Sequence, residues 1–175
     1  MATYKIDVTH SEIAFKVKHL MITNVTGNFT KFDATLQAEN PDFTDAAITF
    51  EADINSINTN NADRDAHLKS DDFFSAEKFP TLHFTSTQIN KLHGSNYALA
   101  GNLTIKNITK PVTLDVEFLG LATDPWGQSK AGFEATGKIN RTDFGLTWNA
   151  ALEAGGVLVS EEVKLQFNIQ FTKQA

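Results

Sequence analysis

The feature that most constrains this chain is a regular alternation of apolar and polar residues along eight segments. Alternation with a period of two is typical of a β-strand that buries one face. The last segment shows it clearly, because Val163, Leu165 and Phe167 alternate with Lys164 and Gln166. The eight segments cover residues 13–19, 31–36, 48–54, 82–85, 97–105, 112–118, 133–139 and 163–171.

Eight sequential strands joined by turns predict an antiparallel meander in a single domain, residues 1–175. Because each strand is apolar on one side, the meander can close as a two-sheet sandwich or as a barrel. A short extra strand near Tyr4–Val8 is expected at an edge. The connection 56–80 is long and predicts a short helix that Asn60 or Asn61 would cap.

The order of the strands predicts that one end of the molecule carries most of its polar chemistry. In an up-and-down meander alternate connections lie at the same end, so the connections 21–26, 56–80, 106–110 and 140–161 share one mouth. His19 ends the first long strand at this mouth. The sequence therefore predicts an apolar tube with polar groups and two long connections at one pole.

Composition excludes several classes of function. The chain has 14 phenylalanines and a formal net charge of −6, and that negative charge disfavours nucleic acid as a partner. The absence of cysteine excludes disulfides, thiolate metal ligands and a cysteine nucleophile. The sequence has no histidine spacing typical of a zinc site. It also lacks phosphate-binding loops and catalytic motifs, and no apolar run is long enough for a membrane span. We expect no cofactor, no metal and no catalytic residue.

Several stretches carry a resemblance to a known family. The longest are Arg64–Phe74, with the sequence RDAHLKSDDFF, and Asn140–Leu146, with the sequence NRTDFGL. Gly101–Lys106 and the pair His10-Ser11 add to them. In these stretches the chain resembles the YceI-like proteins, and the resemblance covers essentially the whole chain. It implies an all-β fold, an extended eight-stranded antiparallel up-and-down barrel of the lipocalin type with one short helix in a long connection. It also implies an isoprenoid or acyl chain in the lumen and no known catalysis.

Inward-facing residues of the predicted strands are the candidates for contact with such a ligand. Aromatic rings would give the lumen stiff walls. His19 faces inward by strand parity, either as an ordinary core group or as a partner of a ligand head group. The candidates are Phe15, Val17, His19, Phe32, Phe50, Phe84, Leu103, Val116, Phe118, Phe133 and Phe167.

Arg64, Asp65, Arg141 and Asp143 are the candidates for contact with a polar head group at the mouth. The alternative, which we prefer at this stage, is that paired charges among them fasten the helix and the long loop to the rim of the barrel. Replacing Arg141 by alanine separates the two interpretations, because a bracing residue loses stability first and a ligand contact loses ligand first.

The sequence thus predicts non-enzymatic binding, storage or transport of a long apolar lipid, a polyisoprenoid or a fatty-acyl chain. One alternative is an enzyme that modifies or isomerises such a lipid with His19, Arg64 or Arg141. Another is a ligand-free structural or interaction module with a filled lumen. The sequence as written shows no signal peptide, so we expect a cytoplasmic protein, or a periplasmic one if a signal was removed. A homodimer, through the outer face or the extra edge strand, stays open.

Overall fold

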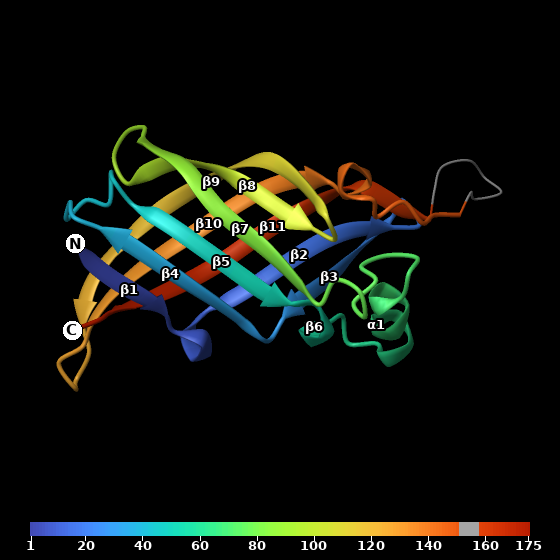
Figure 1. Cartoon of the computed structure of the whole chain (residues 1–175), viewed down its shortest axis with the longest axis horizontal. Helices are drawn as coiled ribbons and strands as arrows, with labels where there is room; N and C mark the ends of the chain where they lie inside the picture. Colours follow the sequence, from blue (N-terminus) through green and yellow to red (C-terminus); the bar gives the residue numbers. More distant parts are fainter. Residues whose placement is uncertain (151–157) are drawn as a thin grey trace.

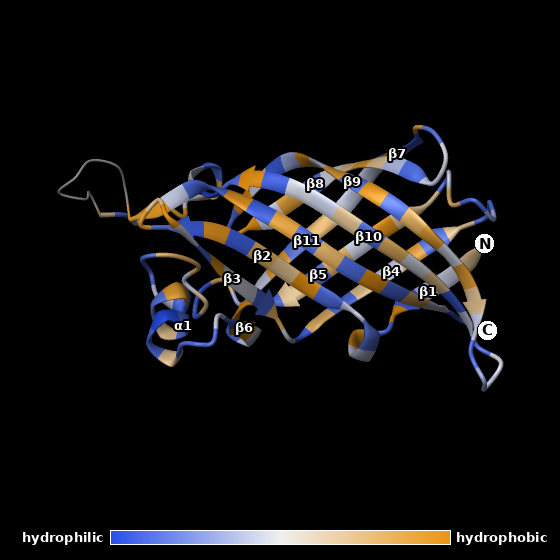
Figure 2. Ribbon diagram, turned by 180° about the vertical axis from the view of Figure 1, so that it is seen from behind, coloured by the Kyte–Doolittle hydropathy of each residue, from blue (hydrophilic) through white to orange (hydrophobic). Residues whose placement is uncertain are grey.

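A closed antiparallel β-barrel is the main feature of the computed structural model, which describes residues 1–150 and 158–175 (Figure 1). Apolar and polar residues alternate along its long strands, as Figure 2 shows for β10, β11 and β2. The strands are β1 (Ala2–Ile6), β2 (Glu12–His19), β3 (Thr23–Phe29), β4 (Phe32–Ala38), β5 (Ala47–Asp53), β6 (Ile57–Asn58), β7 (Thr81–Lys91), β8 (Asn96–Ile105), β9 (Ile108–Thr123), β10 (Ser129–Asn140) and β11 (Val159–Lys173). The helix α1 (Ala62–Lys69) and three short 3-10 turns, η1 (Val8–His10), η2 (Ile54–Ser56) and η3 (Arg141–Phe144), lie in the connections.

Eight positions around the barrel are occupied, in the order β1, β4, β5, β7, β8, β9, β10 and β11, and the pairing of β1 with β11 closes the ring. β2 continues the line of β1, because β11 pairs with β2 along residues 159–168 and with β1 along residues 171–173. β3 likewise runs on into β4 across residues 30–31 and pairs with β2. The predicted barrel is confirmed, and the sandwich is excluded.

Two details of the prediction were wrong. The short strand expected at an edge is β1, and it pairs with β4 on one side and β11 on the other. Residues 21–26 were assigned to a connection, but β3 begins at Thr23. Its first residues, Thr23 and Asn24, are exposed and polar, so the sequence shows no apolar alternation there. Their strand conformation depends on pairing with β2.

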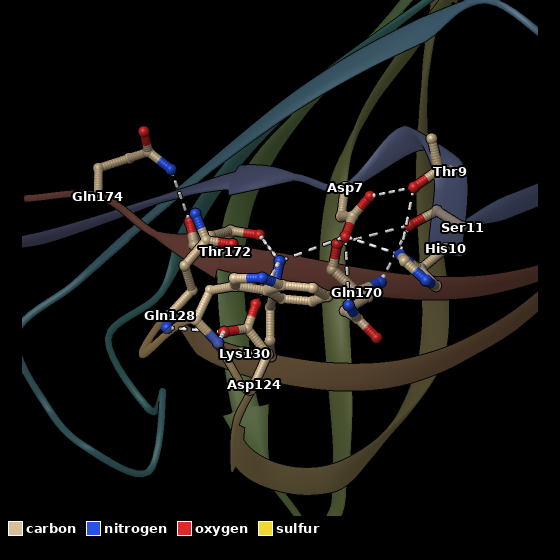
Figure 3. A network of polar contacts seen from close by, with 11 residues as sticks. Asp7, Thr9, His10, Ser11, Asp124, Gln128, Lys130, Gln170, Thr172 and Gln174 are labelled. Atoms are coloured by element: carbon tan, nitrogen blue, oxygen red, sulfur yellow. Dashed lines mark hydrogen bonds and ion pairs between the residues drawn. The ribbon is translucent and has the colours of Figure 1, made fainter.

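A polar network holds the break between β1 and β2 against the neighbouring strands (Figure 3). The Asp7 carboxylate accepts hydrogen bonds from Thr9 at 2.9 Å and Lys130 at 3.3 Å, and it pairs with His10 at 2.9 Å. The Asp7 amide donates to the Gln170 carbonyl at 2.7 Å. Burial alone would raise the pKa of Asp7, but the hydrogen bonds from His10, Thr9 and Lys130 outweigh it and lower the pKa from 3.8 to about 2. The network thus holds β1 and β2, which together occupy one strand position of the barrel, in place beside β11.

The connections predicted to share one end do so, and we call this end the mouth (Figure 1). The Lys106 amine donates to the Gly145 carbonyl at 3.4 Å, which joins the β8–β9 and β10–β11 connections. The His67 ring lies 4.7 Å from the Trp148 ring, centroid to centroid, which brings the β5–β7 connection to the same place. The Leu20 amide donates to the Leu158 carbonyl at 2.8 Å and adds the β2–β3 turn.

The predicted helix is confirmed as α1, and Asn61 is its cap, because the Asn61 side chain accepts from the Arg64 amide at 3.0 Å. In the part of the chain that the structure describes, no helix has the length and the apolar run needed to cross a membrane.

Candidate functional site

The barrel encloses a cavity of about 370 Å³ that is bounded almost entirely by apolar side chains. Eight strands are the number at which a barrel interior is either filled by side chains or holds one small ligand. Side chains do not fill the interior of this barrel, because the cavity remains within it. The predicted lining residues that border the cavity are Phe15, Val17, His19, Phe50, Phe84, Leu103, Val116, Phe133 and Phe167.

Phe43 closes the cavity at the end opposite the mouth. It belongs to the β4–β5 connection and is 2% exposed, with its ring 5.4 Å from that of Tyr4 and 5.3 Å from that of Phe133. The prediction that Phe118 lines the cavity was wrong, because its ring packs against Phe43 at 5.2 Å and does not border the empty space. Phe43 was not among the predicted lining residues. The only available signal was a large apolar residue beside the polar turn Asn40-Pro41-Asp42.

Phe32 was also wrongly predicted as a lining residue. It is the first residue of β4, directly after the break from β3, and is only half-buried. Its ring stacks on that of Phe50, with centroids 6.3 Å apart, and Phe50 borders the cavity. Strand parity gave the correct face, but it could not show that Phe32 stands outside the enclosed space.

The polar groups that border the cavity lie at the mouth. They are His19, Thr59, Arg64, His67 and Arg141. No carboxylate side chain borders the cavity among residues 1–150 and 158–175. A ligand head group at this position would therefore meet hydrogen-bond donors and positive charge.

Arg141 braces the β10–β11 connection through backbone carbonyls. Its side chain is 3% exposed, and it donates from Nε to the Ser160 carbonyl at 2.8 Å and from Nη1 to the Trp148 carbonyl at 3.0 Å. The Leu146 and Val159 carbonyls accept from Nη1 and Nη2, at 2.5 and 3.3 Å. Burial lowers the pKa of Arg141 from its usual value, and the charge of Glu161 opposes that shift. These contacts favour the bracing role.

Arg64 and Asp65 fasten α1 to the segment that precedes it. Arg64 Nε donates to the Thr59 hydroxyl at 2.8 Å, and the Asp65 carboxylate accepts from the Thr59 amide at 2.9 Å. Asp65 does not border the cavity, and neither does Asp143, which is exposed. Paired charges were expected among the four candidates, but no ion pair joins them in the described ranges. The two arginines instead donate to backbone carbonyls and to the Thr59 hydroxyl, because these acceptors lie on the segments that the arginines join.

Comparison with known proteins assigns the family. A family model described as the YceI-like domain matches residues 4–171. The UPF0312 protein SERP2314 of Staphylococcus epidermidis is 40% identical over 173 residues, which is 98% of this chain and 98% of that protein. The chain belongs to the YceI-like family.

Solved structures carry the same fold as this YceI-like chain. The YCEI protein of Campylobacter jejuni is 32% identical, with a TM-score of 0.75 over 90% of each chain. A polyisoprenoid binding domain from Saccharophagus degradans has a TM-score of 0.71 over 98% of each chain. At 15% identity that second likeness concerns the fold alone.

The mouth of the YceI-like barrel is built by the two stretches that carried the resemblance in the sequence. His67 and Phe73 come from the first stretch, and Arg141 from the second lies 5.9 Å above the Phe73 ring. Trp148, just beyond the second stretch, packs against both rings, at 4.7 and 5.5 Å. His67, Phe73 and Trp148 all border the cavity. None of the three was predicted as a ligand contact, and for Phe73 and Trp148 only tertiary packing shows that they lie at the strand ends.

The described residues hold no group of three or more acidic or histidine side chains arranged to bind a metal ion. His67 instead bonds Asp72 at 2.8 Å, and His83 lies 3.5 Å from Glu51 on the outer face. Each of these two histidines thus faces a carboxylate.

Proposed function

We propose that this YceI-like protein binds a long-chain apolar lipid, a polyisoprenoid or fatty-acyl chain, and stores or transports it without chemical change. The observation that carries the proposal is an apolar cavity of about 370 Å³ enclosed within the closed barrel. Pockets of about 300–1,000 Å³ hold small-molecule ligands in proteins. The polyisoprenoid binding domain of Saccharophagus degradans, which has the same fold, supports the choice of lipid class.

Burial of the chain supplies the affinity. Each methylene group moved from water into the cavity contributes about 0.8 kcal/mol, and the walls are already in place before binding. Aromatic residues such as Phe15, Phe84 and Phe133 lose little conformational freedom when a ligand arrives. A ligand-free module predicts a filled interior, and the enclosed cavity argues against it.

We propose that His19 and Arg64 contact the polar head group of the lipid at the mouth. Arg64 uses Nε and Nη2 to bind Thr59, and among residues 1–150 and 158–175 its Nη1 has no acceptor, so it can donate to a head group at the mouth. Arg141, by contrast, already donates to four carbonyls. A head group with hydrogen-bond acceptors fits these donors.

Native mass spectrometry of gently purified protein tests the proposal directly, since it reports the mass of any bound lipid. Ala135 borders the cavity, and Thr136, the next residue of β10, is exposed. Ala135→Phe should fill the cavity and abolish uptake of an isoprenoid, whereas Thr136→Phe, which adds the same ring outside, should retain it. Absence of bound lipid, together with failure of delipidated wild-type protein to take up isoprenoids, would refute the proposal.

A further inference from the structure

A basic patch lies on the outer face of the barrel near its mouth. The strand register places Lys16 of β2 opposite Lys164 of β11, and Lys164 opposite Lys138 of β10. Side chains at such positions have Cβ atoms about 4.5–5.5 Å apart, and like charges there destabilise a sheet. Lys18 shares this face of β2 two residues nearer the mouth, and all four lysines are exposed. Folding therefore does not explain this row of charges.

Few acidic groups balance the patch. Lys138 lies 3.7 Å from Glu162, and both of these side chains are more than half exposed, so the pair is weak. Glu161 is adjacent and exposed. The other three lysines form no ion pair within residues 1–150 and 158–175. The patch thus keeps a positive charge on a chain whose net charge is −6.

The turn that follows β2 exposes three apolar side chains beside this patch. Leu20, Met21 and Ile22 are 41%, 49% and 79% exposed. Leu20 and Met21 have φ angles of 55° and 65°, in the left-handed region that Asn and Gly adopt readily at hairpin turns and bulky residues rarely adopt. The chain accepts both strain and exposed apolar surface here, which suggests a contact outside the molecule.

We propose that the turn Leu20–Ile22 and the lysine patch together dock the mouth of the barrel onto an anionic membrane surface. The apolar turn enters the head-group region, and the lysines contact lipid phosphates. This inference rests on the proposed function, because a docked mouth gives a lipid a path between bilayer and cavity that avoids bulk water.

The spacing along β2 fits this arrangement. At about 3.3 Å per residue, Lys18 lies roughly 7 Å and Lys16 roughly 13 Å from Leu20 along the strand. An apolar segment that enters the interface by about 5–10 Å therefore brings both lysines to the level of the phosphates. On the α1 side of the mouth, exposed carboxylates outnumber exposed lysines, with Asp63, Asp71, Asp72 and Glu77 against Lys78. An anionic surface repels that side, so the β2–β11–β10 face is the one that turns toward the membrane.

Flotation with phosphatidylcholine vesicles, with and without phosphatidylglycerol, tests the proposal. Wild-type protein should float with the anionic vesicles only, and salt should release it. The double variant Lys16→Gln/Lys164→Gln should weaken binding roughly 25-fold, at about fivefold per lysine. The matched control is Lys91→Gln/Lys173→Gln at the opposite end of the barrel, which should bind as wild type does.

A second variant separates docking from folding. Leu20→Asn/Met21→Gly installs residues that this turn geometry favours, so its melting temperature should stay the same or rise. Its binding to anionic vesicles should fall at least about tenfold, since the inserting apolar side chains are gone. Equal vesicle binding by the wild type and both mouth variants would overturn docking. Uptake of an isoprenoid from detergent is measured in parallel, and its failure in the wild type would instead refute the proposed lipid binding.

Discussion

Replacing Arg141 by alanine is the sharpest test of how the mouth is built. The substitution removes a buried cation that donates to four carbonyls. The Leu146, Trp148 and Ser160 carbonyls lose this donor, whereas the Val159 carbonyl keeps the Asn149 side-chain amide at 2.8 Å. Each buried acceptor left unsatisfied costs about 1–3 kcal/mol, and water that enters from the mouth recovers part of this. We expect a total loss of about 3–5 kcal/mol, similar to the loss of one partner of a buried ion pair.

Urea unfolding, followed by tryptophan fluorescence and circular dichroism, measures this loss. For a chain of this size it corresponds to a fall in melting temperature of roughly 6–20 °C. Lys106→Ala is the control, because its amine donates to the same connection only through a 3.4 Å bond to the Gly145 carbonyl, and it should cost less than about 1 kcal/mol. An Arg141→Ala protein that keeps its stability within about 1 kcal/mol but loses bound lipid would show that Arg141 is a ligand contact and not a brace.

Two further substitutions test the break in the first strand and the closed end of the cavity. Asp7 has a pKa of about 2 in the folded protein against 3.8 for the free group, so it contributes roughly 2 kcal/mol above pH 3.8 that is lost as the pH falls toward 2. Asp7→Asn should therefore flatten the acid side of a plot of unfolding free energy against pH, and an unchanged slope between pH 4 and 2 would contradict the network. Phe43→Ala should cost about 3–5 kcal/mol in urea unfolding. It should also extend the cavity away from the mouth, so that native mass spectrometry detects longer bound chains, and an unaltered range of lipid masses would show that Phe43 does not limit the cavity.

The alternation in the sequence was sufficient for an all-β meander and for the polar end of the molecule, whereas the choice of a barrel over a sandwich came from the resemblance to the YceI-like proteins. Alternation is a local signal, since the face of a residue such as Phe84 or Leu103 depends only on its parity within its own strand. The order of strands then fixed which connections share the mouth. For the same reason parity placed most lining residues correctly. Parity also gave the correct face for Phe32 and Phe118, but it could not show that their positions along the barrel lie outside the cavity.

Only the tertiary structure decided which distant segments close the two ends of the cavity. Phe43 packs against β1, β9 and β10, and Arg141 binds carbonyls as far along the chain as Ser160. β3 is a strand because β2 lies beside it, although its own residues are largely polar. These placements depend on contacts between residues far apart in sequence, and no local pattern of hydrophobicity encodes which loop side chain will fill the end of a barrel.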